Sequence, residues 1–148
     1  MSSYQRGLAL RKKVLGRKRV DQKLKDTNTF DSPIQALVTE FAWGTIWSRP
    51  GLTLKQRSLL NLGMLIALNR PHELKGHIGG ALNNGLSEIE IREALIQAAV
   101  YCGFPAALDS FRIAREAIKD FKSSSNTARP ARRGSTPRRS SKLPPKNR

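Results

Sequence analysis

Apolar residues recur along the chain at the three- and four-residue spacing of an α-helix, and no stretch shows the alternation of a strand. The segment SPIQALVTEFAWG begins with Pro33 in a first turn and places four apolar residues on one helix face: Ile34, Leu37, Val38 and Phe41. Gly44 would end this helix. The stretch FAWGTIWSRPGL, with two glycines and Pro50, is then predicted to be a loop that carries Trp43 and Trp47.

Two further helices have clear start and stop signals. Thr53 and Gln56 form a capping box at the start of TLKQRSLLNLGMLIALNR. Apolar residues run nearly all round this segment, so we expect a buried central helix. Pro71 stands at the first position of the next helix, and Gly85 follows its end.

A second capping box, Ser87 with Glu90, opens another helix, EIEIREALIQAAVYC. Its predicted core-facing residues are Ile89, Ile91, Leu95, Ala98, Ala99 and Cys102. Gly103 and Pro105 separate it from a last helix, AALDSFRIAREAIKDF, and a first helix covers residues 4–16. The pattern therefore predicts an all-α, single-domain bundle of about six helices.

The charge of the chain is concentrated at its ends. Residues 1–26 carry nine bases and two acids, residues 123–148 carry eight bases and no acid, and residues 27–122 carry ten bases and nine acids, which together give the net charge of +16. The segment after residue 122 is rich in Ser, Pro and Arg and has almost nothing apolar to bury. We therefore expect one domain over residues 1–122 and a disordered basic tail over 123–148.

Charge, cysteine content and hydropathy indicate which partners and which compartment to expect. A basic tail can bind phosphates without reading sequence, so weak, non-specific nucleic-acid contact is an alternative role, although no helix-turn-helix, zinc-finger or RNP signature is present. The single cysteine fits a reducing compartment. No apolar run is long enough for a membrane span or a secretory signal, so we expect a cytoplasmic protein with no membrane partner.

The segment RPHELKGHIGG contains both histidines. His72 and His77 are five residues apart, which separates them by roughly 140° around a helix and excludes a shared metal ion on one helix. Glu73 and His77 are four apart and lie on one face, where they form either an acid–base pair or a solvated ion pair. Three nearby glycines, Gly76, Gly79 and Gly80, favour close helix packing or a substrate lying against the backbone.

Four stretches together resemble the 4-carboxymuconolactone decarboxylase family: FAWGTIWSRPGL, RSLLNLGMLIALNR, ELKGHIGGALNNG and EIREALIQAAVYCGFPAA. The similarity runs from about Arg6 to Ala117, and Phe41 stands where the family pattern leads us to expect a polar residue. The superfamily also includes enzymes of the alkyl hydroperoxidase D type, which need two cysteines for thiol exchange. Cys102 is alone in this chain, which disfavours that chemistry.

The resemblance implies an alkyl hydroperoxidase D-like helical fold and decarboxylation of 4-carboxymuconolactone to 3-oxoadipate enol-lactone, in the β-ketoadipate pathway of protocatechuate breakdown. The lactone of such a substrate accepts the electrons released by loss of CO₂, so no cofactor and no metal is expected. An enzyme acting on another lactone, or on a peroxide with an external thiol, is the alternative. The family also implies a homo-oligomer, a hexamer.

The resemblance also assigns roles to particular residues. His77 would deliver the proton, and Glu73 would orient His77 and keep it protonated, or carry the proton itself. The remaining candidates would bind the dicarboxylate lactone: Arg57, Arg70, Asn84, Trp47 and Tyr101. Each has a structural alternative: an internal salt bridge for Arg57, helix capping for Arg70 and Asn84, and core packing for the aromatic residues.

Overall fold

The computed structural model describes residues 1–127, and in this range the chain is all-α with no strand, as predicted. The elements in order are α1 (Ser3–Leu15), α2 (Arg17–Lys25), α3 (Ser32–Leu37), the π-helix η1 (Val38–Trp47), α4 (Leu54–Ala67), α5 (Pro71–Asn83), α6 (Glu88–Cys102) and α7 (Phe104–Thr127). None of these helices combines the length and apolar character that a bilayer crossing requires.

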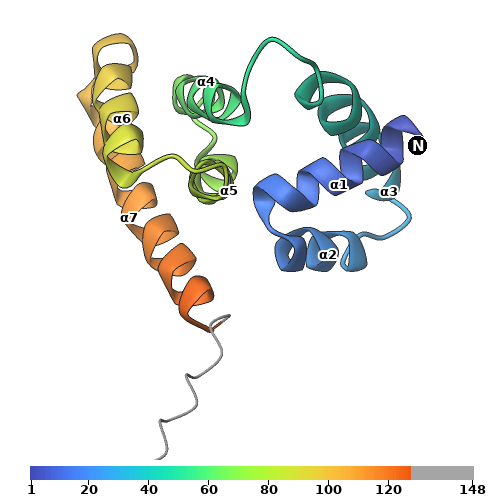
Figure 1. Cartoon of the computed structure of the whole chain (residues 1–148). Coiled ribbons are helices and arrows are strands. Elements are labelled where there is room, and N and C mark those ends of the chain that lie inside the picture. The colour runs from blue at the N-terminus through green and yellow to red at the C-terminus, as the bar shows by residue number, and fades with distance from the viewer. Residues whose placement is uncertain (128–148) are drawn as a thin grey trace, which may run out of the picture.

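The helices form two groups (Figure 1). α1, α2, α3 and η1 pack together, and α4, α5, α6 and α7 form a bundle beside them. The main connection between the groups is the contact of α1 with α5. At this contact Asn83 Nδ2 donates to the carbonyl oxygen of Val14 at 2.8 Å, and the Val14 side chain packs on Gly80. α5 therefore connects the two groups.

The first group depends on a very close crossing of α1 and η1. A Cβ atom added at Gly7 would collide with the carbonyl oxygen of Thr39, and one added at Gly44 would collide with that of Ser3. Next to the crossing, the buried Arg11 guanidinium donates to Thr39 Oγ1 at 2.9 Å. The backbones of the two helices are thus in direct contact, which fixes η1 on α1.

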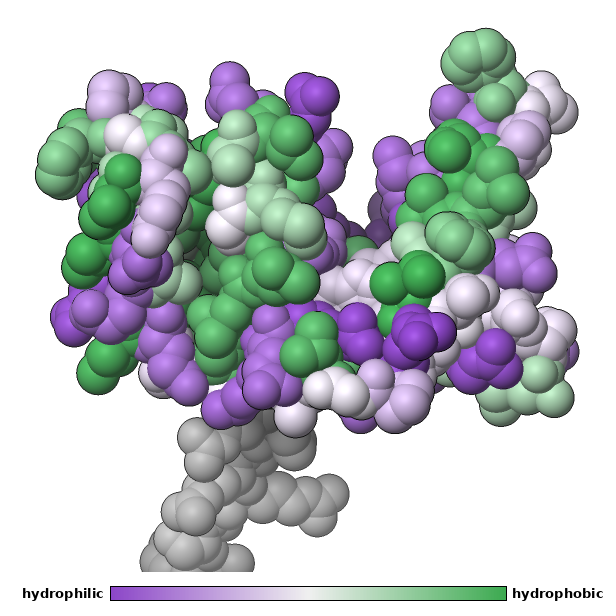
Figure 2. Space-filling model, turned by 90° about the horizontal axis from the view of Figure 1, so that it is seen from above, coloured by the Kyte–Doolittle hydropathy of each residue, from purple (hydrophilic) through white to green (hydrophobic). Residues whose placement is uncertain are grey.

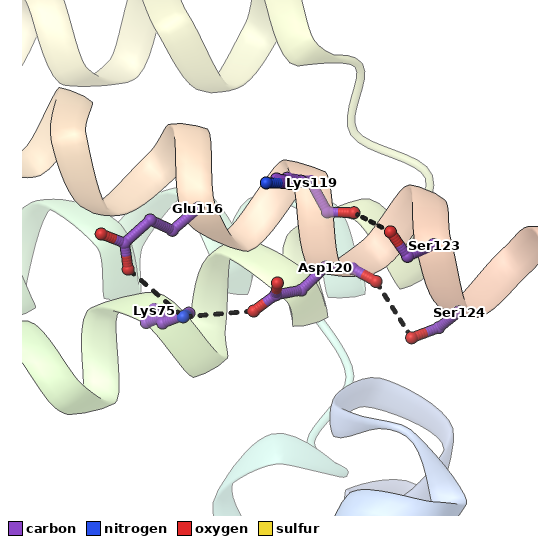
Figure 3. A network of polar contacts seen from close by, with 6 residues as sticks. All are labelled: Lys75, Glu116, Lys119, Asp120, Ser123 and Ser124. Carbon is purple, nitrogen blue, oxygen red and sulfur yellow. Dashed lines mark hydrogen bonds and ion pairs between the residues drawn. The ribbon is translucent and has the colours of Figure 1, made fainter.

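The second group encloses the apolar core, which includes Leu62, Ile66, Leu74, Ile78, Ile91 and Leu95. A polar cluster on its surface holds α5 against α7 (Figure 3). Lys75 Nζ lies 3.3 Å from Glu116 Oε2 and 3.1 Å from Asp120 Oδ2. The two carboxylates accept hydrogen bonds from this ammonium group and raise the pKa of Lys75.

α7 extends beyond the limit predicted for the folded domain. Residues 123–127, which the sequence pattern places in the tail, are helical. The Ser123 and Ser124 hydroxyls donate at 3.0 Å to the carbonyl oxygens of Lys119 and Asp120, one turn earlier (Figure 3). The rest of the predicted tail, residues 128–148, lies outside the described residues.

The helix ends predicted from capping signals are confirmed. The capping boxes of Thr53 and Ser87 both form, Pro71 lies in the first turn of α5, and Gly85 follows α5 with a φ of +87°. The predicted loop that carries the tryptophans is wrong. Gly44 lies inside η1, because the approach of α1 needs a glycine at this place in the helix.

The predicted burial is wrong at several apolar positions. Ile89 is 62% exposed, because it lies in the first turn of α6 and lines an open groove between α4 and α6. α4 is buried along one face only, and Leu60 and Met64 are 54% and 45% exposed. On α3 and η1, the apolar face noted in the sequence is open, with Leu37 61% exposed. These surfaces have no partner within residues 1–127.

The α1–η1 crossing gives a test of the fold. We expect Gly44→Ala to lower the free energy of unfolding by about 1–3 kcal/mol or more, because the new methyl group would displace α1. Gly63→Ala on α4 is the control, since a Cβ there meets no atom within 4 Å and alanine favours the helix by about 1 kcal/mol. Thermal and urea unfolding measure both changes. An equal stability of the two variants would contradict the crossing.

Candidate active site

His77 lies where the two groups of helices meet. It is partly buried on α5, and its imidazole faces side chains from α4 and η1. Asn61 Nδ2 of α4 is 3.4 Å from His77 Nδ1. With Asn61 donating, the neutral imidazole carries its proton on Nε2. Asn61 therefore orients the ring and leaves the second nitrogen for another group.

Two tryptophans of η1 form one wall of this site. Trp43 is 4% exposed, and its ring is parallel to the imidazole of His77, with centroids 6.3 Å apart and an interplanar angle of 1°. Trp47 has its centroid 6.1 Å from that of His77 and stacks on Trp43 at 4.7 Å. The π-helix thus turns both residues toward α5, and they exclude water from one side of the imidazole.

The surroundings keep His77 neutral. The pKa of His77 is lowered to about 4, first by burial and then by the positive charge of Arg19, whereas the carboxylate of Glu73 acts in the opposite direction. Glu73 is exposed, and among residues 1–127 no hydrogen bond or ion pair joins it to the imidazole. In the unliganded chain burial and Arg19 outweigh Glu73 in their effect on the pKa of His77, and the catalytic role of Glu73 stays a prediction.

Two further residues act on His77 that sequence reasoning missed, Asn61 and Arg19. Arg19 belongs to a basic run, and Asn61 lies in an apolar helix, so neither stood out. The glycine at position 76 was the available signal, because the guanidinium of Arg19 occupies the space that a side chain would need there. Recognising this contact requires knowing that α2 approaches α5.

Asn84 and Arg57 already donate to groups within the chain. The Asn84 amide donates to Ser58 Oγ at 2.9 Å and to the carbonyl oxygen of Leu54 at 3.4 Å, which joins the end of α5 to α4. Arg57, one turn before Asn61 on α4, donates to the carbonyl oxygen of Arg49 at 2.8 Å, and its buried Nε has no hydrogen-bond partner. The ion pair considered for Arg57 is not present among residues 1–127.

Arg70 and Tyr101 lie away from His77 within one chain. Both line a hollow of about 690 Å³ between the end of α4, the start of α5 and α7. Tyr101 is 82% exposed and also lines an apolar groove between α4 and α6, as does Cys102. His77 lines neither of these hollows. Of the predicted site residues, the fold brings Trp47 and His77 together, with Glu73 one turn away on α5.

Seen from above in Figure 2, a notch separates the group that contains α4 from the group that contains η1, and hydrophobic residues gather on the faces of both groups. Within residues 1–127, no group of three or more His, Cys, Asp or Glu side chains could hold a metal ion. The available chemistry is that of an imidazole, a nearby carboxylate and a guanidinium beside an aromatic wall.

The low pKa of His77 predicts how stability depends on pH. Above pH 6.5 the imidazole is neutral in both states and contributes nothing. As the pH falls from 6.5 toward 4, the unfolded chain binds a proton that the folded chain does not, so the free energy of unfolding should decrease by up to about 3 kcal/mol. Urea unfolding of the wild type and of His77→Gln at several pH values measures how much of the pH dependence of stability comes from His77. An identical pH dependence in both would contradict it.

Comparison with known proteins agrees with the resemblance seen in the sequence. The profile of the carboxymuconolactone decarboxylase family matches residues 33–116. Nitrosuccinic acid decarboxylase npaB of Metarhizium robertsii is 45% identical over 127 residues, which cover 86% of this chain and 89% of that protein. 4-Carboxymuconolactone decarboxylase of Acinetobacter baylyi is 39% identical over 117 residues, 79% of this chain and 87% of that one. The chain belongs to the carboxymuconolactone decarboxylase family.

Proposed function

We propose that the protein is a carboxy-lyase that removes CO₂ from a small dicarboxylic acid without a cofactor. The observation that carries this proposal is the partly buried imidazole of His77, oriented by Asn61 and bordered by Trp43 and Trp47, in a chain of this family. An imidazole held in this way can transfer one proton at a fixed place.

The two relatives act on molecules with shared chemistry, to judge from their names. Nitrosuccinic acid and 4-carboxymuconolactone each carry two carboxylates, and each has a group that can accept an electron pair. When the bond between the leaving carboxylate and its carbon breaks, the electron pair moves into the nitro group or the lactone. A proton must then be added to carbon, and in our proposal the imidazolium of His77 supplies it.

The protonation state of His77 fits this role only in the complex. The unliganded imidazole is neutral near pH 7, since its pKa is about 4. A bound dianion adds negative charge beside the ring, which favours its protonated form. The substrate itself therefore prepares the acid, and solvent supplies the proton.

The assay that tests this function uses both substrates. Purified protein is mixed with nitrosuccinic acid and, separately, with 4-carboxymuconolactone, the substrate predicted from the sequence, and release of CO₂ is measured. We test nitrosuccinic acid first because that relative is 45% identical, against 39% for the other. Turnover of either substrate after dialysis against a chelator supports the proposal. No CO₂ from either substrate would contradict it.

The assay also tests the role of His77. We expect His77→Ala to lower kcat on the order of a hundredfold or more, in line with loss of a general acid. His72→Ala is the matched control, because His72 is exposed and lies on another face of α5. Activity in His77→Ala close to that of the wild type would remove this residue from the mechanism.

We further propose that the chain works as a homo-oligomer, a hexamer. Support comes from apolar surface that one copy leaves open: Ile34, Leu37 and Phe41 are 55%, 61% and 62% exposed along α3 and η1. An apolar groove of about 650 Å³ lies between α4 and α6. Patches of this kind mark protein interfaces in soluble proteins.

Light scattering tests the assembly. We expect the wild type to be several times heavier than the 16.5 kDa chain, and Leu37→Lys to be smaller, because a charge would enter the apolar contact. Circular dichroism should show unchanged helix content, since Leu37 is exposed within one copy. A monomeric wild type would contradict the assembly.

A further inference from the structure

Arg19 is an exposed cation of α2 whose guanidinium lies against α5 at the residue before His77. Its guanidinium lies against the backbone of α5 at Gly76, where an added Cβ would be 2.5 Å from Nη2 and 2.9 Å from Cζ. Among residues 1–127 no carboxylate lies within ion-pair distance of Arg19. Within these residues the guanidinium also donates no hydrogen bond, and Arg19 is exposed, so its outward N–H groups can donate to an anion.

The position of Arg19 is fixed by the rest of α2. Gly16, with a φ of +91°, turns the chain sharply between α1 and α2. Val20, the next residue after Arg19, is 2% exposed and anchors the helix. Asp21 forms an ion pair of 2.6 Å with Lys12 of α1. The backbone that carries Arg19 is thus held on both sides of it, so the contact with Gly76 is built into the fold.

We propose that Arg19 binds the carboxylate that the substrate retains and so holds the departing carboxylate at His77. This inference rests on the proposed decarboxylase function and adds the reason for a dicarboxylate substrate. A guanidinium binds a carboxylate through two parallel hydrogen bonds, which fixes the orientation of the molecule as well as its position. A substrate with a single carboxylate would lose this second contact.

The same contact couples binding to proton transfer. Two charged groups act on His77, Arg19 from α2 and Glu73 from its own helix, while η1 and α4 present the uncharged Trp43, Trp47 and Asn61. A carboxylate on Arg19 cancels the positive charge that lowers the pKa of His77. His77 then takes a proton from solvent when substrate arrives.

Nuclear magnetic resonance with succinate, a dicarboxylate that cannot react, tests the proposal without an activity assay. In a His72→Gln background the only imidazole signal comes from His77. We expect Arg19→Gln to raise the pKa of His77 in the free protein, because a nearby cation is lost. Succinate should raise this pKa when Arg19 is present and leave it unchanged in Arg19→Gln, and its Kd should be at least tenfold weaker in the variant.

Lys23→Gln is the control for charge, since it removes an exposed cation from the same helix. It should bind succinate as the wild type does. Equal succinate binding by Arg19→Gln and Lys23→Gln would overturn the proposal, as would a succinate-induced rise of the His77 pKa that persists in Arg19→Gln.

Gly76→Ala tests the position of the guanidinium rather than its charge. The new methyl group should displace the Arg19 side chain and raise KM at least tenfold, with a smaller effect on kcat. Gly79→Ala is the comparison, because a Cβ there meets no atom within 4 Å. An unchanged KM in Gly76→Ala would count against the proposal. A wild type that releases no CO₂ would contradict the proposed function alone, because succinate binding still decides the role of Arg19.

Discussion

The direct contact between the backbones of α1 and η1 is the constraint on which the site depends. Gly7 and Gly44 permit it, and any side chain at either position would force the two helices apart. Because η1 is fixed in this way, Trp43 and Trp47 are carried to α5 and border His77. α1 then continues to its own contact with α5. One helix therefore positions both the aromatic wall and the helix that bears the imidazole.

Three arginines at different depths show how charge is distributed around the site: Arg11 is buried, Arg57 is partly buried and Arg19 is exposed. Arg11 and Arg57 donate to groups of the chain, Thr39 and the carbonyl oxygen of Arg49, and so join elements together. Arg19 has no such role and keeps its hydrogen-bonding groups available beside the imidazole. Arg11 and Arg57 each use only part of the guanidinium for these contacts, because the buried Nε of each has no hydrogen-bond partner among residues 1–127. Arg19 is exposed and, in our proposal, binds an anion next to the neutral histidine.

Local signals in the sequence predicted the helix ends, because a capping box or a proline in a first turn acts within a few residues. The family pattern likewise led to His77 and Trp47, which the fold brings together. The π-helix was not predictable, since a glycine after an apolar run usually marks the end of a helix. Gly44 instead lies inside η1, because α1 packs against it and leaves no room for a side chain. Asn61 and Arg19 were missed for the same reason: their roles arise from the approach of helices that are distant in sequence. The exposure of apolar positions such as Ile89 was also not predictable, because periodicity reveals an apolar helix face but does not show whether another element covers it.

Arg19 lies on a different part of the chain from the other residues around His77. The family profile matches residues 33–116, a range that contains the two tryptophans, Asn61, Glu73 and His77 but not α2. The imidazole and its aromatic wall lie within the range that the profile matches, while the guanidinium comes from a short helix before that range. Mutations in α2 can alter the charge offered to a ligand and leave the core of α4 to α7 intact. In our proposal, the charge that binds the ligand and the core that carries the imidazole therefore lie on separate elements of the chain.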